Sequence, residues 1–233
     1  YEIRNCDWSS DVCSSDLKGN GKFVNEFDAY FKHCSYSTMG TEFADINNDG
    51  LPDLLGVDML PEGNYRQKQL RRANNYDEFD KLVRYGFGYQ YVKNVMQKNN
   101  GNGTFSDISY YSGLAYSDWS WGVLINDFDN DGLKDVYIAN GSIRDITDMD
   151  FVKFRMDSVK KLLIKAGSRE DVLKLLSLIP SYKVVKNYYK NYGDFRFQKE
   201  SKESGLDQPA WSFGCAYADL DNDGDLEIIV NNA

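Results

Sequence analysis

The sequence predicts a mainly β protein, a partial β-propeller with α-helical insertions between its blades. Three observations lead to this fold class. An aspartate-rich loop occurs three times, short β-branched segments flank the copies, and a Gly/Asn turn that ends in phenylalanine precedes each copy at one fixed distance. Three or four short strands per repeat are typical of propeller blades.

Equal spacing identifies the repeat. The three loops begin at Asp45, Asp127 and Asp219. A phenylalanine lies 22 residues before each loop and closes a turn of sequence GNGKF, GNGTF or GDFRF; these are Phe23, Phe105 and Phe197. A glycine lies five residues before each loop, at Gly40, Gly122 and Gly214. Such spacing is not expected of a chance motif and indicates one structural unit used three times.

The segments beside the loops predict strands. Residues 123–126 and 215–218 precede a loop, and residues 54–58, 136–140 and 228–232 follow one. These segments are short and rich in β-branched residues, and turn residues lie beyond them. Strand, tight acidic turn and strand make a hairpin. The Gly/Asn turn before the second and third phenylalanines predicts a further strand pair in each unit.

Successive loops lie farther apart than a blade of about 40–50 residues requires, so we expect insertions. Helical insertions are predicted at about 62–95 and 143–190. Within the second, residues 148–180 predict two helices, because Ser168 resembles a capping residue and Pro180 ends the pattern. We expect the apolar stripes of these helices to pack on the β-core. The alternative is a groove for a partner.

The first 17 residues are set apart from the rest. Asp7–Leu17, DWSSDVCSSDL, matches a translated sequencing adapter, so we interpret 1–17 as non-native and 18–233 as a fragment of one propeller domain. A genuine Ser/Asp-rich linker is the alternative. Two of the four cysteines fall in this segment, and the other two, Cys34 and Cys215, are expected to be buried free thiols.

The loops carry oxygen ligands at regular positions. They read DINNDGLPD, DFDNDGLKD and DLDNDGDLE, with side-chain oxygens at positions 1, 3, 5 and 9 and glycine at position 6. Glycine permits the positive φ that wraps the chain around an ion, and position 7 offers its backbone carbonyl. Six to eight hard oxygen ligands without nitrogen or sulfur favour Ca²⁺ over zinc or copper, and Mg²⁺ is disfavoured because it resists this much dehydration. The candidate ligands of about three sites are Asp45, Asn47, Asp49, Leu51 and Asp53; Asp127, Asp129, Asp131, Leu133 and Asp135; and Asp219, Asp221, Asp223, Asp225 and Glu227.

Two alternatives to this calcium loop were weighed. A solvated turn that binds nothing would leave several carboxylates to repel one another within a few ångströms. An EF-hand needs a bidentate glutamate at position 12, where this chain has Gly56, Ile138 and Val230. It also needs a helix after the loop, where strands are predicted here. A metal-binding hairpin turn is therefore the favoured interpretation.

Composition excludes several classes of partner. The formal net charge of −9 and the pI near 4.7 argue against nucleic acid or an anionic membrane, because phosphates would be repelled. If each loop takes one divalent ion, the balance moves to about −3. The sequence has no run of about 18 apolar residues, so it predicts no transmembrane segment.

These segments resemble the FG-GAP/VCBS repeat proteins and, within them, the ASPIC/UnbV-like group of secreted bacterial proteins. The resemblance is carried by NNGNGTF at 99–105, DWSWG at 118–122, DFDNDGLKDVYIANG at 127–141 and the segment 205–232, and it covers residues 18–233. It implies a β-propeller, often seven-bladed and related to the integrin α-subunit head, with calcium in the hairpin turns. The first loop departs from this pattern, since Asn47 replaces an aspartate and is expected to weaken that site without abolishing it.

The resemblance also implies an extracytoplasmic protein, secreted or on a bacterial cell surface, with the signal peptide and the rest of the propeller outside this fragment. The leading hypothesis is a non-catalytic, calcium-stabilised scaffold for binding or adhesion that presents its loops to an unidentified protein or glycan. The alternative is a carbohydrate-binding or hydrolase-associated propeller, either an enzyme or an enzyme accessory.

Few residues support catalysis. The chain has no GxSxG, HExxH or Cys–His pairing, Ser158 and Lys161 fall on a predicted helix, and the sole histidine, His33, is expected to be structural. A deep pocket with acids outside the loops would favour an enzyme, and we expect none. Stacking of sugars on tryptophans and tyrosines is a third hypothesis. Because Trp119 and Trp211 recur at one repeat position, we expect both in the blade core.

Overall fold

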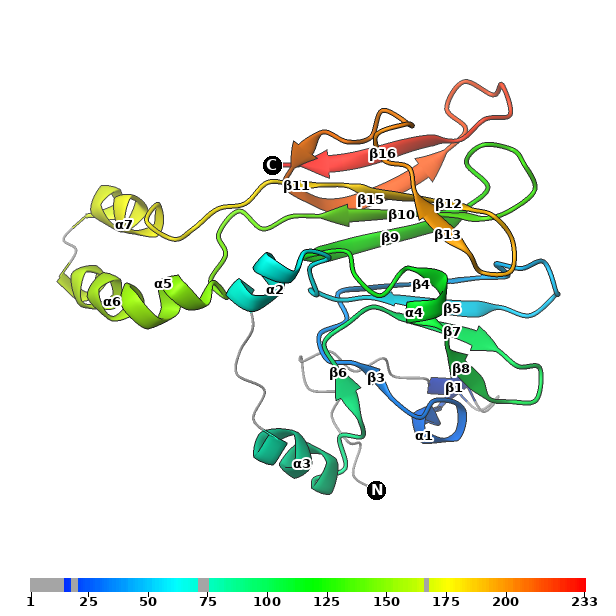
Figure 1. Ribbon diagram of the computed structural model, residues 1–233, viewed down its shortest axis with the longest axis horizontal. Helices are drawn as coiled ribbons and strands as arrows, with labels where there is room; N and C mark the ends of the chain where they lie inside the picture. Colours follow the sequence, from blue (N-terminus) through cyan, green and yellow to red (C-terminus); the bar gives the residue numbers. More distant parts are fainter. Residues whose placement is uncertain (1–14, 18–20, 71–75, 166–167) are drawn as a thin grey trace.

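The computed structural model describes residues 15–17, 21–70, 76–165 and 168–233. Its main body is mainly β and consists of two four-stranded antiparallel sheets and one hairpin, stacked side by side (Figure 1). Blade 1 has the strand order β4 (Gly40–Ala44), β5 (Asp53–Val57), β7 (Val95–Asn99) and β8 (Phe105–Asp107). Blade 2 has the order β9 (Ser120–Asn126), β10 (Asp135–Asn140), β12 (Asn187–Asn191) and β13 (Phe197–Lys199). Blade 3 is the hairpin of β15 (Ser212–Ala218) and β16 (Glu227–Asn232).

Short elements connect and flank the blades. The minor strand pairs are β1 (Ser15–Leu17) with β2 (Phe23–Asn25), β3 (Cys34–Ser35) with β6 (Gln90–Tyr91), and β11 (Val184–Val185) with β14 (Pro209–Ala210). The helices are α1 (Phe27–Tyr30), α2 (Asn64–Leu70), α3 (Tyr76–Arg84), α4 (Ser109–Ser112), α5 (Met149–Phe154), α6 (Met156–Lys165) and α7 (Arg169–Leu176). No helix in the described part of the chain has the length and apolar character needed to cross a bilayer.

The predicted strands around the loops are confirmed, but the sequence repeat and the blade are out of phase. Phe105 lies on the last strand of blade 1, and the loop that follows it 22 residues later belongs to blade 2. Both insertions therefore fall inside a blade, between its second and third strands. Our expectation of insertions between blades was wrong, because the distance between loops does not show which strand gap is enlarged. The predicted range 143–190 is also too wide, since it runs over β11 and into β12.

The core lies between the faces of neighbouring blades. In β10, Val136 and Ile138 join a fully buried cluster with Leu55 and Val57 of blade 1. The alternate residues of β10 face the other way, and Tyr137 packs in a second cluster with the blade 3 hairpin. Burial on both faces explains why β10 is a continuous apolar run rather than an alternating one.

Blade 3 has one exposed face. Ile229 of β16 is 47% exposed, whereas the residues at the same repeat position of blades 1 and 2, Leu55 and Tyr137, are fully buried. Blade 3 packs against blade 2 through its other face, with Cys215, Ile228 and Val230 in the second cluster. The residues of β16 are thus apolar on both sides of the strand, as in a strand that is covered on both faces.

The repeated glycine five residues before each loop permits close approach of the blades. A Cβ on Gly40 would lie 2.8 Å from the carbonyl oxygen of Trp121 in blade 2, and one on Gly122 would lie 2.9 Å from Cys215 Sγ in blade 3. A Cβ on Gly214 would meet nothing within 4 Å. Cys34 and Cys215 form no disulfide among the described residues; Cys34 is buried as expected, Cys215 is half-buried, and burial raises the pKa of the Cys215 thiol to about 11.

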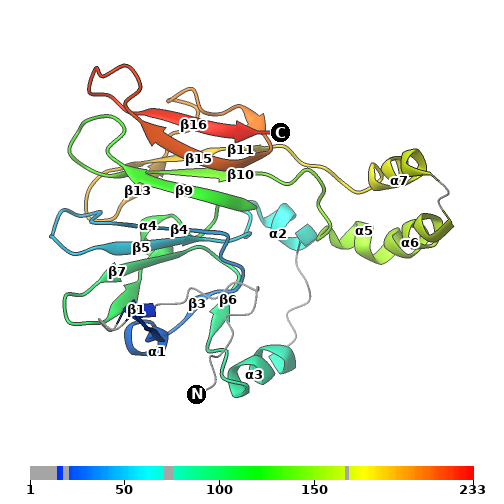
Figure 2. The same ribbon diagram turned by 180° about the vertical axis from the view of Figure 1, so that it is seen from behind.

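The second insertion is an arm that projects away from the blades (Figures 1 and 2). Its helices begin where expected, since Asp148 Oδ1 accepts from Phe151 N at 2.8 Å and Ser168 Oγ from Asp171 N at 3.1 Å. The first predicted helix is divided into α5 and α6 at a non-helical Arg155. Only part of the apolar stripe is covered.

The expectation that the apolar stripes pack on the β-core was wrong. Phe151 and Val159 are buried, but Phe154 is 78% exposed and Leu162 is 49% exposed. The helices of the arm contact one another, and α5 contacts α2, so the arm does not lie on the sheets. The two repeated tryptophans are also half-buried rather than part of the blade core.

Candidate metal centre

The three acidic loops share one backbone conformation and lie together at one end of the blades, opposite the helical arm (Figure 1). Each connects the first and second strands of its blade. Positions 4 and 6 are left-handed in all three copies, with φ of 57°, 58° and 62° at Asn48, Asn130 and Asn222, and 85°, 89° and 96° at Gly50, Gly132 and Gly224. The glycine was predicted. The asparagine was missed, although asparagine is the residue type after glycine that best tolerates this conformation.

Backbone amides orient the first carboxylate of each loop. Asp127 accepts from Asp131 N at 3.0 Å on one oxygen and from Gly132 N at 2.8 Å on the other. Asp45 accepts two equivalent bonds, both at 2.9 Å. Asp219 accepts two bonds at 2.7 and 3.1 Å. Each carboxylate oxygen keeps a further acceptor site, so the loop presents fixed oxygen ligands rather than mobile ones.

Two loops bring three acids together. Ligand oxygens of Asp127, Asp129 and Asp131 all lie within 4.8 Å of one another, and so do those of Asp219, Asp221 and Glu227. Most of these residues are exposed, with Asp127 and Glu227 half-buried. Crowded carboxylates of this kind repel one another unless a cation lies among them.

The first loop has an amide where the others have a third acid. Asn47 donates from Nδ2 to Asp49 Oδ2 at 2.8 Å. Its carbonyl oxygen Oδ1 is buried and has no hydrogen-bond partner among the described residues. A buried acceptor without a partner is costly, and a cation at this loop would satisfy it. The amide therefore fits a weaker oxygen ligand at position 3.

A lysine from the third strand of blade 2 places a cation at the second loop. Lys190 Nζ contacts the carboxylates of Asp129 and Asp131, the latter at 3.1 Å. These hydrogen bonds raise the pKa of Lys190. The ammonium group shows that this oxygen cluster attracts positive charge, and the all-oxygen donor set fits a hard divalent ion.

The acid at position 9 connects the loop with the third strand of its blade. Asp53 is fully buried and accepts from Asn99 N at 2.8 Å, while Asp135 is fully buried and accepts from Asn191 N at 2.9 Å. Burial raises the pKa of both carboxyls, although the backbone hydrogen bonds oppose this shift. Tyr188 also donates its hydroxyl to Asp135, at 2.7 Å.

The asparagine partners of position 9 recur at a fixed place in the sequence, and this repeat could have predicted their contact with the loop. Asn99 and Asn191 both stand six residues before the phenylalanine that closes the Gly/Asn turn. Each also donates its side-chain amide to the carbonyl oxygen at position 8 of the loop, at 3.1 Å to Pro52 and 2.9 Å to Lys134. The turn and the loop are thus two parts of one hydrogen-bonded unit within a blade.

Neighbouring loops are joined through the asparagine at position 4. Asn48 Nδ2 donates to Gly132 O at 2.9 Å, which joins the first loop to the second. Asn130 Nδ2 donates to Asp225 Oδ1 at 2.6 Å, which joins the second to the third. The position 7 carbonyls, including that of Asp225, remain predicted ligands.

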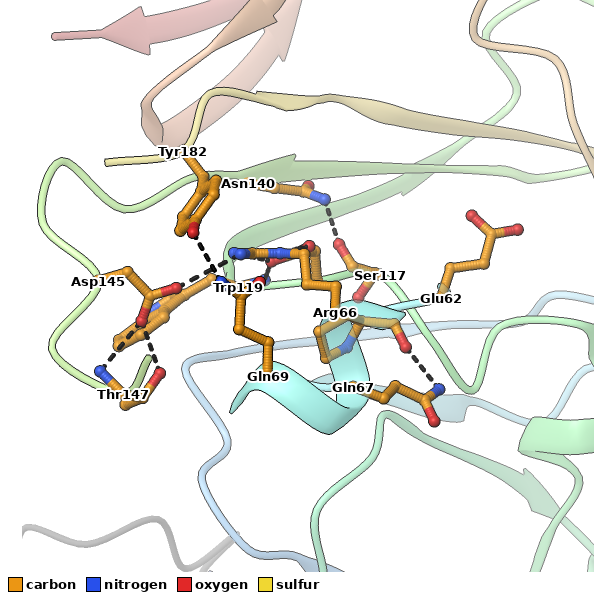
Figure 3. Close-up of polar contacts among 12 residues, drawn as sticks. Glu62, Arg66, Gln67, Gln69, Ser117, Trp119, Asn140, Asp145, Thr147 and Tyr182 are labelled. Carbon is orange, nitrogen blue, oxygen red and sulfur yellow. Dashed lines mark hydrogen bonds and ion pairs between the residues drawn. The ribbon is translucent and has the colours of Figure 1, made fainter. Parts of the chain in front are cut away.

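Acids outside the loops also border a pocket, which is half-open rather than deep. A cavity of about 310 Å³ is bordered by Glu62 and Asp118. Arg66 donates to both oxygens of Asp118, at 2.5 and 3.0 Å, and to Asp145 at 3.4 Å (Figure 3). Glu62 pairs with Lys199 at 2.9 Å. Both pocket acids are therefore engaged by cations, and Arg66 joins the first insertion to blade 2 and to the segment before α5.

Comparison with known proteins agrees with the repeat. The sequence model of the FG-GAP-like repeat family matches residues 82–138. The chain carries an FG-GAP-like repeat. The matched span contains the outer strand pair of blade 1, the first hairpin of blade 2 and the whole second acidic loop, so the family repeat has the same phase as the sequence unit. A search of curated proteins finds no match to this chain.

Proposed function

We propose that this protein is a non-catalytic, calcium-stabilised propeller module of the ASPIC/UnbV-like type, which acts outside the cytoplasm as a scaffold for binding or adhesion. The observation that supports it most is the repeated loop, in which fixed carboxylates converge and Lys190 supplies positive charge at one copy. FG-GAP-like repeats are typical of extracellular propeller modules, which supports the location.

In each loop the oxygens at positions 1, 3, 5 and 9 would hold one calcium ion, with the carbonyl of position 7. The ion supplies a compact double positive charge that neutralises the crowded carboxylates. The chain does the rest: backbone amides orient position 1, and position 9 holds the third strand through its bond to Asn99 or Asn191. An ion that binds only the folded loop stabilises the blade by mass action.

A non-catalytic role is favoured by the state of the acids outside the loops. Asp118 is held by the guanidinium of Arg66, and Glu62 by Lys199. His33 contacts Asp107 through Nε2 at 2.6 Å, and this contact holds its ring in place. No unpaired acid and base stand together at a cavity in the described residues.

Calcium titration of demetallated protein tests the proposal. We expect heat of binding with about three ions per chain, weakest at the first loop, and little response to Mg²⁺. At a calcium concentration 100 times Kd each site adds about 2.7 kcal/mol to the free energy of unfolding. For a chain of this size each kcal/mol raises Tm by roughly 2–4 °C.

Variants of the second loop supply the control. Asp127→Asn together with Asp131→Asn should remove one ion and part of the rise in Tm, whereas Asp157→Asn on exposed α6 should change neither. Absence of calcium-dependent heat and of any change in melting with chelator would refute the proposal.

A further inference from the structure

A second cavity lies away from the acidic loops, between α2 and the connections of blade 1. Its volume is about 790 Å³, within the range of small-molecule sites. Its walls come from α2 and the residues before it, the β3–β4 and β6–β7 connections, α4 and the start of β9. Figure 3 shows Gln67, Trp119 and Thr147 of this wall around α2. No residue of an acidic loop lines the cavity.

Aromatic rings form much of this wall. Trp119, Tyr36, Tyr91 and Tyr110 all line the cavity, and Tyr91 and Tyr110 are 44% and 64% exposed. Neighbouring rings brace them: Trp119 stacks on Trp121 at 6.3 Å between ring centres. Similarly, Tyr91 lies 5.9 Å from Phe79, and Tyr110 lies 5.8 Å from Tyr116. Held rings offer flat apolar surface at small entropic cost, and the C–H face of a sugar ring packs on such a surface.

The charge of the wall is opposite to that of the chain. The sixteen lining residues include His33, Lys68 and Lys93 but no aspartate or glutamate, although the chain has 36 acidic and 27 basic residues. His33 and Lys93 already have a charged partner, because both contact the carboxylate of Asp107 behind the wall. Lys68, on exposed α2, has no ion-pair partner among the described residues. One ammonium group is thus available to a ligand.

Uncharged polar groups complete the wall. Asn64 and Gln67 lie on α2 on the same cavity as Lys68, and Ser37 lies across from them on the β3–β4 connection. The indole Nε1 of Trp119 is buried and has no acceptor among the described residues. A wall of aromatic and aliphatic side chains with a few polar groups and, among the described residues, a single free cation is the composition of a site for a polar ring compound with one negative charge.

We propose that this cavity binds a carboxylate-bearing oligosaccharide, with sugar rings on Trp119, Tyr91 and Tyr110 and the carboxylate on Lys68. A nucleotide fits less well, because a phosphate chain calls for several cations or a cradle of backbone amides, and among the described residues of this wall one cation is free. The inference names the ligand class of the proposed binding function, but it does not depend on calcium.

Isothermal titration at low salt with sialyllactose, a trisaccharide that carries one carboxylate, tests the site, with its methyl ester as the neutral analogue. We expect the ester to bind about tenfold more weakly. Lys68→Gln should weaken sialyllactose binding about tenfold and leave the ester unchanged, whereas Tyr110→Ala should weaken both ligands. Lys160→Gln, an exposed lysine of α6, is the matched control and should change neither. Circular dichroism checks that each variant is folded.

Equal affinity for sialyllactose and its ester, no binding of either, an equal loss in Lys160→Gln, or tighter binding of ATP than of sialyllactose would each overturn the inference. The titrations are run both after chelation and at 1 mM Ca²⁺. Selective loss in Lys68→Gln under either condition supports the site even where calcium titration gives no heat. Calcium binding without this selectivity would leave the calcium proposal in place and refute this one.

Discussion

Lys190→Gln should tighten calcium binding at the second loop. The ammonium group of Lys190 contacts the carboxylates of Asp129 and Asp131, so it competes with an ion that enters the loop. The lysine side chain is 24% exposed and each aspartate side chain is 33% exposed, which makes these partly solvated ion pairs. Glutamine removes the competing charge and keeps a side chain of similar length.

The magnitude follows from the two contacts. Exposed ion pairs contribute about 0.2–1 kcal/mol each, so their loss lowers the free energy of unfolding of the metal-free form by up to about 2 kcal/mol. If the lysine remains about 4 Å from a bound ion, repulsion between its charge and the ion adds about 2 kcal/mol in water. The loss of the ion pairs and the repulsion from the ion are not added, because the lysine either moves away when the ion binds or remains beside it. We therefore expect a gain of about 1–2 kcal/mol in calcium binding, roughly 5- to 30-fold in Kd.

Calorimetric titration of demetallated protein measures this gain. Asp219→Asn and Asp221→Asn in the same chain remove the third site and simplify the isotherm. Lys199→Gln is the matched control, because it lies in the same sheet as Lys190 but pairs with Glu62 at 2.9 Å. The gain should shrink as salt increases. An unchanged or larger Kd in Lys190→Gln, or the same gain in Lys199→Gln, would refute the reasoning.

Three further predictions concern stability. Gly122→Ala places a methyl group 2.9 Å from Cys215 Sγ and should lower the free energy of unfolding by about 1–3 kcal/mol in urea, whereas Gly214→Ala, with nothing within 4 Å, should be close to neutral. Arg66→Met leaves two buried carboxylates without their cation and should cost about 3–5 kcal/mol by the same measurement; a loss under 1 kcal/mol would contradict this. For Asp107, burial raises the pKa, but hydrogen bonds from its histidine, lysine and serine partners outweigh burial and lower it. The charged carboxylate of Asp107 therefore stabilises the fold fully above the unfolded pKa of about 3.9, and this stabilisation is lost as pH falls. The difference in unfolding free energy between wild type and Asp107→Asn should shrink from pH 5 to pH 2. A constant difference over this range would show that the pairing is unimportant.

The parts of the fold that depend on local sequence could be predicted. The segment predicted as a strand at 136–140 is β10, which begins at Asp135, and the strand predicted at 54–58 is β5 with its end shifted by one residue. The loop conformation also follows from local sequence, because the tight turn needs a positive φ at position 6 and glycine permits it independently of distant segments. Local signals of this kind do not depend on the packing of distant segments.

The parts that depend on distant segments could not be predicted. Lys190 enters the second loop from β12, 59 residues after Asp131, and no pattern near either residue indicates the contact. The burial of Asp135 follows from β12 pairing with β10 across the whole second insertion. The helical arm shows the same limit: Phe154 and Leu162 fit the helical spacing of an apolar stripe, but both are exposed, because periodicity does not say what covers a stripe.

The hydrogen bonds of the loops join each blade to the next. Within a blade, the carboxylate at position 9 holds the third strand, as Asp135 does through Asn191. Between blades, Asn48 reaches the second loop and Asn130 reaches the third. An ion that fixes one loop therefore stabilises its own sheet and the junction to its neighbours, much as the stability of repeat proteins depends on nearest-neighbour contacts. The second loop has a neighbour on both sides among the described residues, so loss of its ligands should cost more stability than the same loss in the first or third loop.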